Sequence, residues 1–234
     1  MPELPWFGME IDTIFFDVGS TLVFAEPKLV RGPLFERHLE PSEEQLCAAE
    51  TEARRAIDKV LQKHSAPVDG TYWSAYYRKL LSEMGIDDAG LAAALIARAR
   101  ESSNWCRLKP GTPEVLEQFR KQYRLGVISN SDGRVSNLLE KVGIRRFFDT
   151  VTDSGTVGVE KPDSRIFRAA MESLNAVPEH SLYLGDIYSV DYVGATEAGM
   201  KAILMDSNAV YRRSNLPRVE SLRELLDIMS FEGR

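Results

Sequence analysis

The sequence predicts an α/β protein built on a doubly wound parallel sheet, with a helical segment inserted into it. Two observations lead to this fold class. Short apolar runs that suit buried strands alternate along much of the chain with segments of helical periodicity. Between the first of these runs and the second, residues 28–106 show helical patterns and no convincing buried strand.

The first strand is expected at Ile14 to Phe16, an apolar run that is too short for a helix and is stopped by Gly19. A run without polar residues suits a strand that is buried on both faces, as in a parallel sheet. Asp17 then lies at the carboxyl end of this strand, which is where open α/β sheets bind ligands. Residues 19–24 are expected to form a tight turn with a short flap over this position.

Proline and glycine mark the entrance to the helical segment. Pro27 and Gly32-Pro33 are expected to break the chain at a hinge. The stretch Pro41-Ser42-Glu43-Glu44 then starts a helix, with Ser42 as the N-cap and acidic residues in the first turn. This helix is expected to run to about Leu61 with one apolar face.

Two more helices are expected in this segment. One opens at Thr71 and is stopped by Gly85, and the next is capped by Asp87 or Asp88. The first of these two helices carries four aromatic side chains. We interpret them as the core of the helical segment rather than as a binding surface, because such residues are usually buried. They are Tyr72, Trp73, Tyr76 and Tyr77.

The chain returns to the sheet through a hinge at residues 108–113. Four further strands are then expected, at residues 125–129, 150–152, 182–184 and 202–205, with helical segments between them and a last helix at 222–228. Strands that alternate with helices pair in parallel, because each helix carries the chain back across a face of the sheet.

Composition excludes several classes of protein. The chain has 234 residues, a net charge of −6 and a pI near 5.3, which argues against a nucleic-acid-binding protein. No apolar run approaches the length of a membrane span, and Glu3 and Pro5 stand where a signal peptide would have a basic region. Cys47 and Cys106 have no metal-binding spacing and need not pair, so a cytoplasmic location is expected.

Four short motifs follow one another in the chain. They are Asp17-Val18-Gly19-Ser20-Thr21-Leu22, residues 127–131 (VISNS), residues 158–163 (GVEKPD), and Leu184-Gly185-Asp186 followed by Asp191. Together they resemble the ordered motifs of the haloacid dehalogenase-like hydrolase superfamily over nearly the whole chain. The resemblance implies a hydrolase core of residues 1–23 and 107–234, and a helical cap of residues 24–106 that covers the site and selects substrates.

The resemblance also implies a role for each of these residues. Asp17 is expected to attack phosphorus and to form an aspartyl-phosphate that water hydrolyses. Lys161 supplies positive charge to the phosphoryl oxygens, as phosphoryl transfer requires. The Ser129 hydroxyl and the backbone amide of Asn130 are expected to donate hydrogen bonds to the same group. The expected substrate is a small phosphorylated metabolite.

A metal site is expected beside the nucleophile. Asp186 and Asp191 lie on one loop and join Asp17, and such a cluster of like charges repels without a cation. Mg²⁺ takes oxygen ligands, usually one or two carboxylates with water and phosphate. We assign Asp17, the carbonyl of Gly19 and Asp186 to Mg²⁺, with Asp191 as a further ligand or a residue just outside the ligand set.

One position departs from the family pattern. Phosphatases of this family usually carry a second Asp two residues after the nucleophile, where this chain has Gly19. That Asp protonates the leaving oxygen, and general acid–base catalysis contributes about 10²- to 10⁴-fold. The chain is therefore expected to use substrates with good leaving groups or to borrow a group from the cap. The candidates for that group are Glu26, Lys28, Arg31 and His38.

Three alternative functions remain open. A 2-haloacid dehalogenase also lacks the second Asp, although that branch normally lacks the metal site that Asp186 and Asp191 suggest. A phosphonate-cleaving hydrolase would need a cap lysine, for which Lys59 is available. A pseudo-enzyme that binds a phosphorylated ligand or a protein partner would not need the retained nucleophile. The chain is expected to be a monomer or a homodimer.

Overall fold

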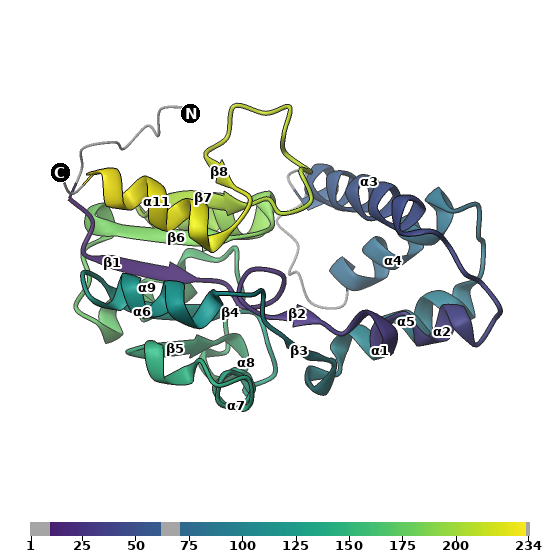
Figure 1. The fold of residues 1–234 in the computed structure, drawn as a ribbon, viewed down its shortest axis with the longest axis horizontal. Helices are drawn as coiled ribbons and strands as arrows, with labels where there is room; N and C mark the ends of the chain where they lie inside the picture. Colours follow the sequence, from purple (N-terminus) through teal and green to yellow (C-terminus); the bar gives the residue numbers. More distant parts are fainter. Residues whose placement is uncertain (1–9, 62–70, 233–234) are drawn as a thin grey trace.

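Six strands form one parallel sheet at the centre of the molecule (Figure 1). The computed structural model describes residues 10–61 and 71–232. The strand order is β5-β4-β1-β6-β7-β8, and every neighbouring pair is parallel. The strands are β1 Thr13–Phe16, β4 Arg124–Ser129, β5 Thr150–Asp153, β6 Ser181–Gly185, β7 Lys201–Met205 and β8 Arg218–Val219. The α/β class and the doubly wound parallel sheet are confirmed.

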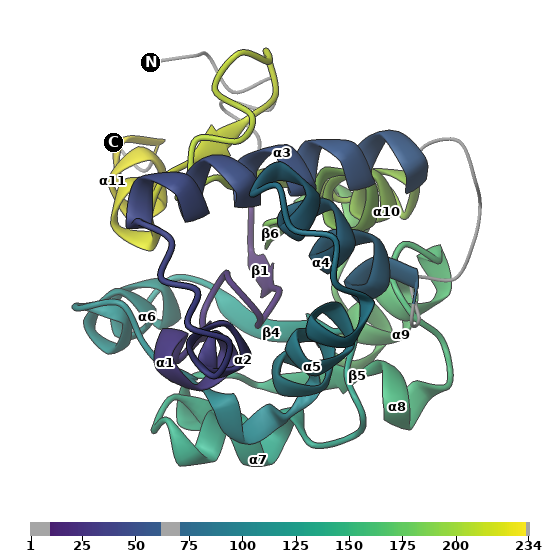
Figure 2. The ribbon, with the colours of Figure 1, turned by 90° about the vertical axis from the view of Figure 1, so that its right-hand side faces the viewer.

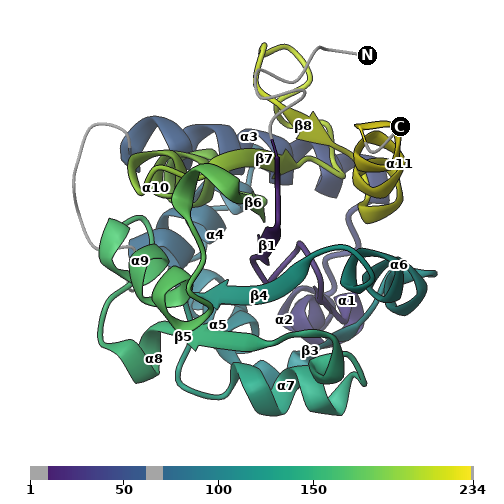
Figure 3. The same ribbon diagram turned by 90° about the vertical axis from the view of Figure 1, so that its left-hand side faces the viewer.

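Helices cover both faces of this sheet, as Figure 3 shows. One face packs against α6 (Thr112–Arg120), α7 (Val135–Lys141) and α11 (Leu222–Glu232). The other packs against α9 (Ser164–Ser173) and α10 (Val193–Glu197). The side chains of β1 divide between the two sides, because Phe16 packs with the first group and Phe15 with the second. Burial on both faces is what the unbroken apolar run of β1 predicted.

Shorter elements join these strands and helices. They are η1 Ser102–Asn104, η2 Arg145–Phe147, α8 Ser154–Val157, η3 Pro178–His180 and the π-helical turn η4 Tyr188–Tyr192. The turn after β1 is closed by a bridge between Gly19 and Val23. Ser20 supplies the left-handed conformation of this turn, with φ of 60°. Gly19 itself is not among the residues with positive φ.

A two-stranded antiparallel ribbon leads into and out of the helical insertion. Its strands are β2 (Phe24–Ala25) and β3 (Trp105–Arg107). The insertion consists of α1 Pro27–Val30, α2 Gly32–Phe35, α3 Glu43–Leu61, α4 Thr71–Glu83 and α5 Ala89–Arg100. Pro27 and Gly32-Pro33 were expected to break the chain, and both lie at boundaries between elements, since Pro27 begins α1 after β2 and Gly32-Pro33 begins α2 after α1. Each proline lies in the first turn of a short helix, where the missing N–H costs nothing.

The insertion has an apolar core of its own, formed by side chains from α1 to α5. Two of its helices begin as expected. The Ser42 hydroxyl accepts from Gln45 N at 3.1 Å and the Gln45 side chain accepts from Ser42 N at 2.9 Å, which is a capping box. Asp88 caps α5 by accepting from Leu91 N at 2.9 Å.

The insertion lies over the carboxyl ends of the sheet strands. Figure 1 shows β1 pointing toward the insertion. Figure 2 is viewed from the side of the insertion and shows the end of β1 with α3, α4 and α5 on one side of it and α1 and α2 on the other. The polar ends of β1, β4 and β6 therefore face the helical insertion. Among the described residues, no helix is both long enough and apolar enough to cross a bilayer.

Candidate active site

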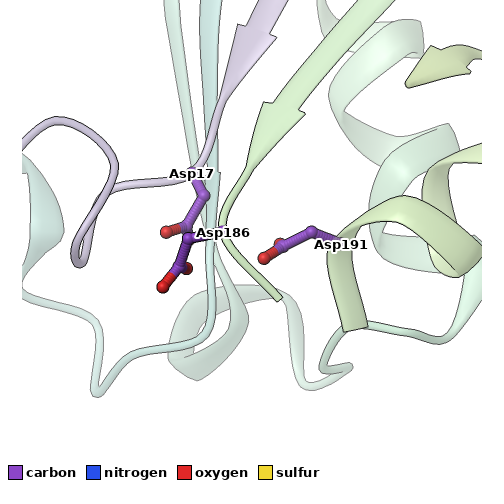
Figure 4. Close-up of side chains that lie close together, drawn as sticks. All are labelled: Asp17, Asp186 and Asp191. Carbon is purple, nitrogen blue, oxygen red and sulfur yellow. The ribbon is translucent and has the colours of Figure 1, made fainter. Parts of the chain in front are cut away.

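Three carboxylates meet at the carboxyl end of the sheet. Asp17 directly follows β1, Asp186 directly follows the neighbouring strand β6, and Asp191 lies in η4. Asp17, Asp186 and Asp191 are 7%, 5% and 1% exposed, and one oxygen from each lies within 4.8 Å of the others. Figure 4 shows Asp191 pointing from its helical turn toward the other two. The motif residues therefore converge on one buried acidic cluster.

Gly185 allows Asp191 to approach the end of β6. A β-carbon at Gly185 would lie 2.4 Å from Asp191 Cγ, closer than any side chain permits. The backbone amide of Ile187 then donates to Asp191 Oδ2 at 2.9 Å. The glycine and the turn that follows it hold the Asp191 carboxylate beside the strand end.

One buried ammonium neutralises part of this cluster. Lys161 Nζ donates to Asp17 Oδ1 at 2.7 Å, to Asp191 Oδ1 at 2.7 Å and to the Tyr183 hydroxyl at 2.9 Å. The Tyr183 hydroxyl in turn donates to Asp191 Oδ1 at 2.9 Å. All three Nζ–H donors of the lysine are thus used. Tyr183 is a site residue that the sequence analysis placed only in a strand.

Asn130 positions Lys161 through its side chain. Its Nδ2 donates to the Lys161 carbonyl at 2.9 Å, and its Oδ1 accepts from the Lys161 amide at 2.7 Å. Ser129, the last residue of β4, is buried and lines the same pocket as Asp17. Ser129 and Asn130 thus lie where the sequence placed them, next to the proposed nucleophile, and Asn130 also supports the lysine.

Burial and like charge disfavour the ionised forms of two carboxylates. Burial, with the nearby Asp191 and Asp186, raises the pKa of Asp17 to about 7 although Lys161 opposes this change. Burial also raises the pKa of Asp186, against the effect of Arg54. Burial disfavours the charged form of Lys161, but the two carboxylates outweigh it and its pKa is raised. The cluster therefore calls for more positive charge than Lys161 provides.

The donor set suits Mg²⁺, which prefers carboxylate and carbonyl oxygens. Asp191 has protein donors on both of its oxygens, Lys161 and Tyr183 on Oδ1 and Ile187 N on Oδ2. Among the described residues, Asp186 is held at Oδ2 only, by Arg54 at 2.5 Å. Asp17 and Asp186 are therefore better disposed to hold a cation directly than Asp191 is.

Arg54 is a site residue that the sequence analysis missed. It projects from α3 of the insertion, and its partner Asp186 belongs to the sheet domain, 132 residues away in the chain. Its Nε is buried and finds no hydrogen-bond partner among the described residues. Asp58, one turn further along α3, accepts from Ser189 Oγ at 2.8 Å and from the Tyr211 hydroxyl at 2.6 Å. The helix thus contacts the loops around the acidic cluster at two points.

A pocket of about 690 Å³ lies between the insertion and the sheet, with Asp17, Ser129, Lys161 and Asp186 in its wall. Its other wall comes from the insertion and includes all four of the predicted core aromatics, Tyr72, Trp73, Tyr76 and Tyr77. They belong to the insertion core as expected, and they also line the pocket, which the sequence analysis did not expect.

The structure separates the candidates for a cap-borne catalytic group. Of the four considered, Arg31 lines the pocket, whereas Glu26, Lys28 and His38 are not among its lining residues. Arg31 is paired with Glu43 at 2.9 Å and with Glu50 at 3.3 Å. Lys59, the lysine considered for phosphonate cleavage, is exposed and also lies outside the pocket lining. Lys59 is therefore not placed to serve in phosphonate cleavage.

Gly19 faces an aromatic ring. A β-carbon at this glycine would lie 3.3 Å from Trp105 Cζ3 and 3.6 Å from Cη2. The indole is held by its Nε1, which donates to the Ala99 carbonyl at 2.7 Å, and its neighbour is Trp73. Trp105 therefore occupies the space next to the position two residues after Asp17.

Comparison with known proteins identifies the family. A profile of haloacid dehalogenase-like hydrolases matches residues 11–199, which contain all four motifs. The chain belongs to this family. It is 30% identical over 203 residues to a glyceraldehyde 3-phosphate phosphatase of Methanothermobacter thermautotrophicus, covering 84% of this chain and 86% of the relative.

Structures of haloacid dehalogenase-like hydrolases share the fold. The magnesium-bound putative hydrolase YfnB of Bacillus subtilis superposes with a TM-score of 0.70, at 19% identity, over 94% of this chain and 99% of that one. A 2-haloacid dehalogenase of Pseudomonas syringae superposes with a TM-score of 0.57, at 22% identity, over 94% and 99%. Both dehalogenases and other hydrolases thus share this architecture, so the chemistry is decided by the side chains of the site.

Proposed function

We propose that this hydrolase is a Mg²⁺-dependent phosphatase that acts on a small phosphorylated metabolite through an aspartyl-phosphate. The observation that carries the proposal is the buried Asp17 carboxylate, held 2.7 Å from Lys161 Nζ and clustered with Asp186 on the wall of a pocket. The phosphatase name of the relative in Methanothermobacter thermautotrophicus supports the same reaction class.

The chemistry uses two steps at phosphorus. A carboxylate oxygen of Asp17 attacks the phosphorus atom, and the ester P–O bond breaks with its electron pair leaving on the alcohol oxygen. Water then attacks the phosphorus of the aspartyl-phosphate, which releases inorganic phosphate and restores Asp17. Lys161, the Ser129 hydroxyl and the Asn130 amide donate to the phosphoryl oxygens in both steps.

Asp17, Asp186 and the carbonyl of Gly19 would hold Mg²⁺, with Asp191 supporting them through Lys161 and Tyr183. When bound, the metal supplies positive charge to the phosphoryl oxygens, which electrostatic catalysis of phosphoryl transfer requires. Its charge also offsets the repulsion among three buried carboxylates.

The leaving group is the second element of the proposal. Gly19 offers no proton donor, and the indole of Trp105 covers it. A leaving group that departs on this side must be a stabilised anion, or must be protonated by water. We therefore propose that substrates with a weakly basic leaving oxygen, such as acyl, enol or aryl phosphates, are turned over faster than alkyl phosphates, and that the organic part of the substrate packs against the aromatic wall.

The insertion completes the proposal. Residues 24–106 act as the cap that closes the pocket over residues 1–23 and 107–234, and its aromatic wall selects the organic part of the substrate. The partner is a small molecule, the chain works as a monomer or homodimer, and the two unpaired cysteines, Cys47 and Cys106, suit a cytoplasmic location.

One experiment tests the reaction class. Turnover of a panel of phosphate esters and of 2-haloacids is measured with Mg²⁺ and with a chelator, for the wild-type protein and for Asp17→Asn. Phosphate release that requires both Mg²⁺ and Asp17 supports the proposal. Halide release without Mg²⁺ indicates a dehalogenase, and tight phosphate binding without any turnover indicates a pseudo-enzyme.

A further inference from the structure

Arg54 brings a positive charge from the insertion into the acidic cluster. Its Nη1 lies 2.5 Å from Asp186 Oδ2, and its side chain is 17% exposed. It lines the pocket together with Asp17 and Lys161. A guanidinium carries five N–H donors, and planar anions with several oxygens, such as phosphate, match its geometry.

The hydrogen-bonding capacity of this guanidinium is not fully used. Its Nε is buried and has no partner among the described residues. A buried donor without an acceptor is unfavourable, and buried polar groups normally have partners in the protein, water or a ligand. Nε itself has almost no accessible surface, so an acceptor in the pocket meets the exposed part of the Arg54 side chain and reaches Nε only when the guanidinium shifts.

The hydrogen bonds of Asp58 determine where α3 places the Arg54 side chain. Its carboxylate accepts from Ser189 Oγ, from Ser189 N at 3.2 Å and from the Tyr211 hydroxyl. Residues 54 and 58 are four apart on α3 and so lie on the same side of the helix. The contacts of Asp58 therefore hold this side of α3, including the Cα and Cβ atoms of Arg54, against the sheet domain.

An anion that enters this site needs a cation to receive it. Lys161 and Arg54 are two cations among the three carboxylates of the cluster. The phosphoryl group of a substrate adds negative charge to a site that already carries an excess of it. A cation on the insertion side is placed to receive that charge, opposite the lysine from the sheet domain.

We propose that Arg54 is the anion-binding residue of the insertion, which donates to the phosphoryl oxygens of the substrate, and that Asp58 is its positioning residue. The inference rests on the proposed phosphatase function and extends it. The insertion then completes the phosphoryl site as well as covering it, because one of the phosphate ligands comes from α3.

The experiment measures binding and turnover separately. Affinity for inorganic phosphate is measured by titration calorimetry at saturating Mg²⁺, and KM and kcat are measured with p-nitrophenyl phosphate. Arg54→Gln is expected to weaken phosphate binding about 10- to 100-fold, as for the loss of a charged hydrogen bond. Arg54→Lys keeps the positive charge but loses the planar set of N–H donors, and its phosphate affinity is expected to lie between those of Arg54→Gln and wild type. Asp58→Asn is expected to raise KM, by a smaller factor than Arg54→Gln does.

Lys59→Gln is the matched control, because it removes one positive charge from the exposed side of the same helix. It should leave phosphate affinity and turnover unchanged. A folded Arg54→Gln variant with the phosphate affinity of Lys59→Gln overturns the inference. So does a variant in which only Mg²⁺ affinity changes, since Arg54 is then a counter-ion of Asp186.

A second measurement reads the contact in the wild-type protein and uses a variant only for assignment. The Nε–H resonance of Arg54, assigned through its loss in Arg54→Lys, should shift when phosphate is added to wild-type protein with Mg²⁺. No shift at saturating phosphate overturns the inference. If wild-type protein binds phosphate but hydrolyses no ester, the phosphatase proposal fails and the Arg54 contact is still tested by this shift.

Discussion

Lys161 Nζ lies 2.7 Å from Asp17 Oδ1 and 2.7 Å from Asp191 Oδ1, so a single buried ammonium joins the proposed nucleophile to the turn after β6. Asp17 directly follows β1 and Asp191 lies in the turn η4 after β6, while Asn130 directly follows β4 and holds the lysine backbone. Electrostatic catalysis requires charges that are already in place, and this network fixes them before substrate binds.

Asp17→Asn is expected to abolish turnover while the fold is kept. The side chains have nearly the same shape, and burial with the nearby Asp191 and Asp186 raises the pKa of Asp17, so the fold is not expected to depend on its charge. Phosphate release and the thermal midpoint are measured together. The variant should melt no more than a few degrees below wild type, and wild-type turnover in it would exclude Asp17 as the nucleophile.

Mg²⁺ affinity is expected to depend on pH. Metal binding needs the Asp17 carboxylate, and its pKa of about 7 means that the acid form predominates below that pH. The raised pKa means that the metal-free protein binds a proton that the metal must displace, so affinity rises as pH rises. Apparent affinity should fall about tenfold per pH unit below 7 and level off above it.

Titration calorimetry at pH 5.5, 6.5, 7.5 and 8.5 checks this dependence. Measurements in two buffers with different ionisation enthalpies should also show proton release at the lower pH values. Asp17→Asn provides the control, because its residual Mg²⁺ binding should lack the step near pH 7. A flat profile for wild type would show that Asp17 does not change its protonation when metal binds.

Asp186 and Asp191 are expected to differ in their effect on the metal. Asp186→Ala should lower Mg²⁺ affinity more strongly, because only Arg54 engages its carboxylate among the described residues. Asp191→Asn should act through Lys161 and Tyr183, with a loss of about 10- to 100-fold in affinity or activity, as for residues that orient ligands. Equal effects, or a larger one at Asp191, would place Asp191 among the direct ligands.

The sheet could be predicted because its strands are local signals. All but one of the predicted strands are apolar runs that a turn residue ends, the exception being residues 150–152 (TVT), and the observed bounds lie within about a residue of the expected ones. Strand β8, at Arg218–Val219, has only two residues and no apolar run, so it carries no such signal. The starts of α3 and α5 followed from Ser42 and Asp88, since caps are also local, whereas α1 and α2 were not predicted.

The site was only partly predictable for the same reason. The four motifs place Asp17, Ser129, Lys161 and Asp186 at strand ends, and parallel strands bring their ends together. Arg54 contacts Asp186 only because α3 packs over the sheet, and no local pattern in the sequence of the helix predicts that contact. Asp58 could have pointed to this contact, because an acidic residue beside the apolar face of α3 needs a partner when it is buried.

Trp105 was missed for a different reason. It lies 86 positions after Gly19 in the chain, at the return from the insertion, and only the pairing of β2 with β3 brings it to the site. Aromatic residues are usually interpreted as part of a hydrophobic core, and the Trp105 ring is indeed partly buried against the core of the sheet domain. Its functional consequence depends on the ring covering a glycine, which is a tertiary relationship.

Gly19→Asp tests whether the missing acid limits this enzyme. The backbone does not oppose the change, because the positive φ of the turn lies at Ser20. The obstacle is the indole, whose Cζ3 would lie 3.3 Å from the new β-carbon. The single variant should therefore gain little, and Gly19→Asp combined with Trp105→Leu should gain more. The gain should fall on alkyl phosphates, whose leaving oxygen needs a proton, with a ceiling of about 10²- to 10⁴-fold.

The comparison uses kcat/KM for a series of alkyl and aryl phosphates, with Trp105→Leu alone as the control for the enlarged pocket. Wild-type kcat/KM should fall steeply as the leaving oxygen becomes more basic, because nothing at Gly19 protonates it. In the double variant this dependence should flatten, since the new carboxylic acid donates the proton to alkyl leaving groups. A folded, Mg²⁺-binding double variant with the same steep dependence as Trp105→Leu would show that another group, or water, already supplies the proton.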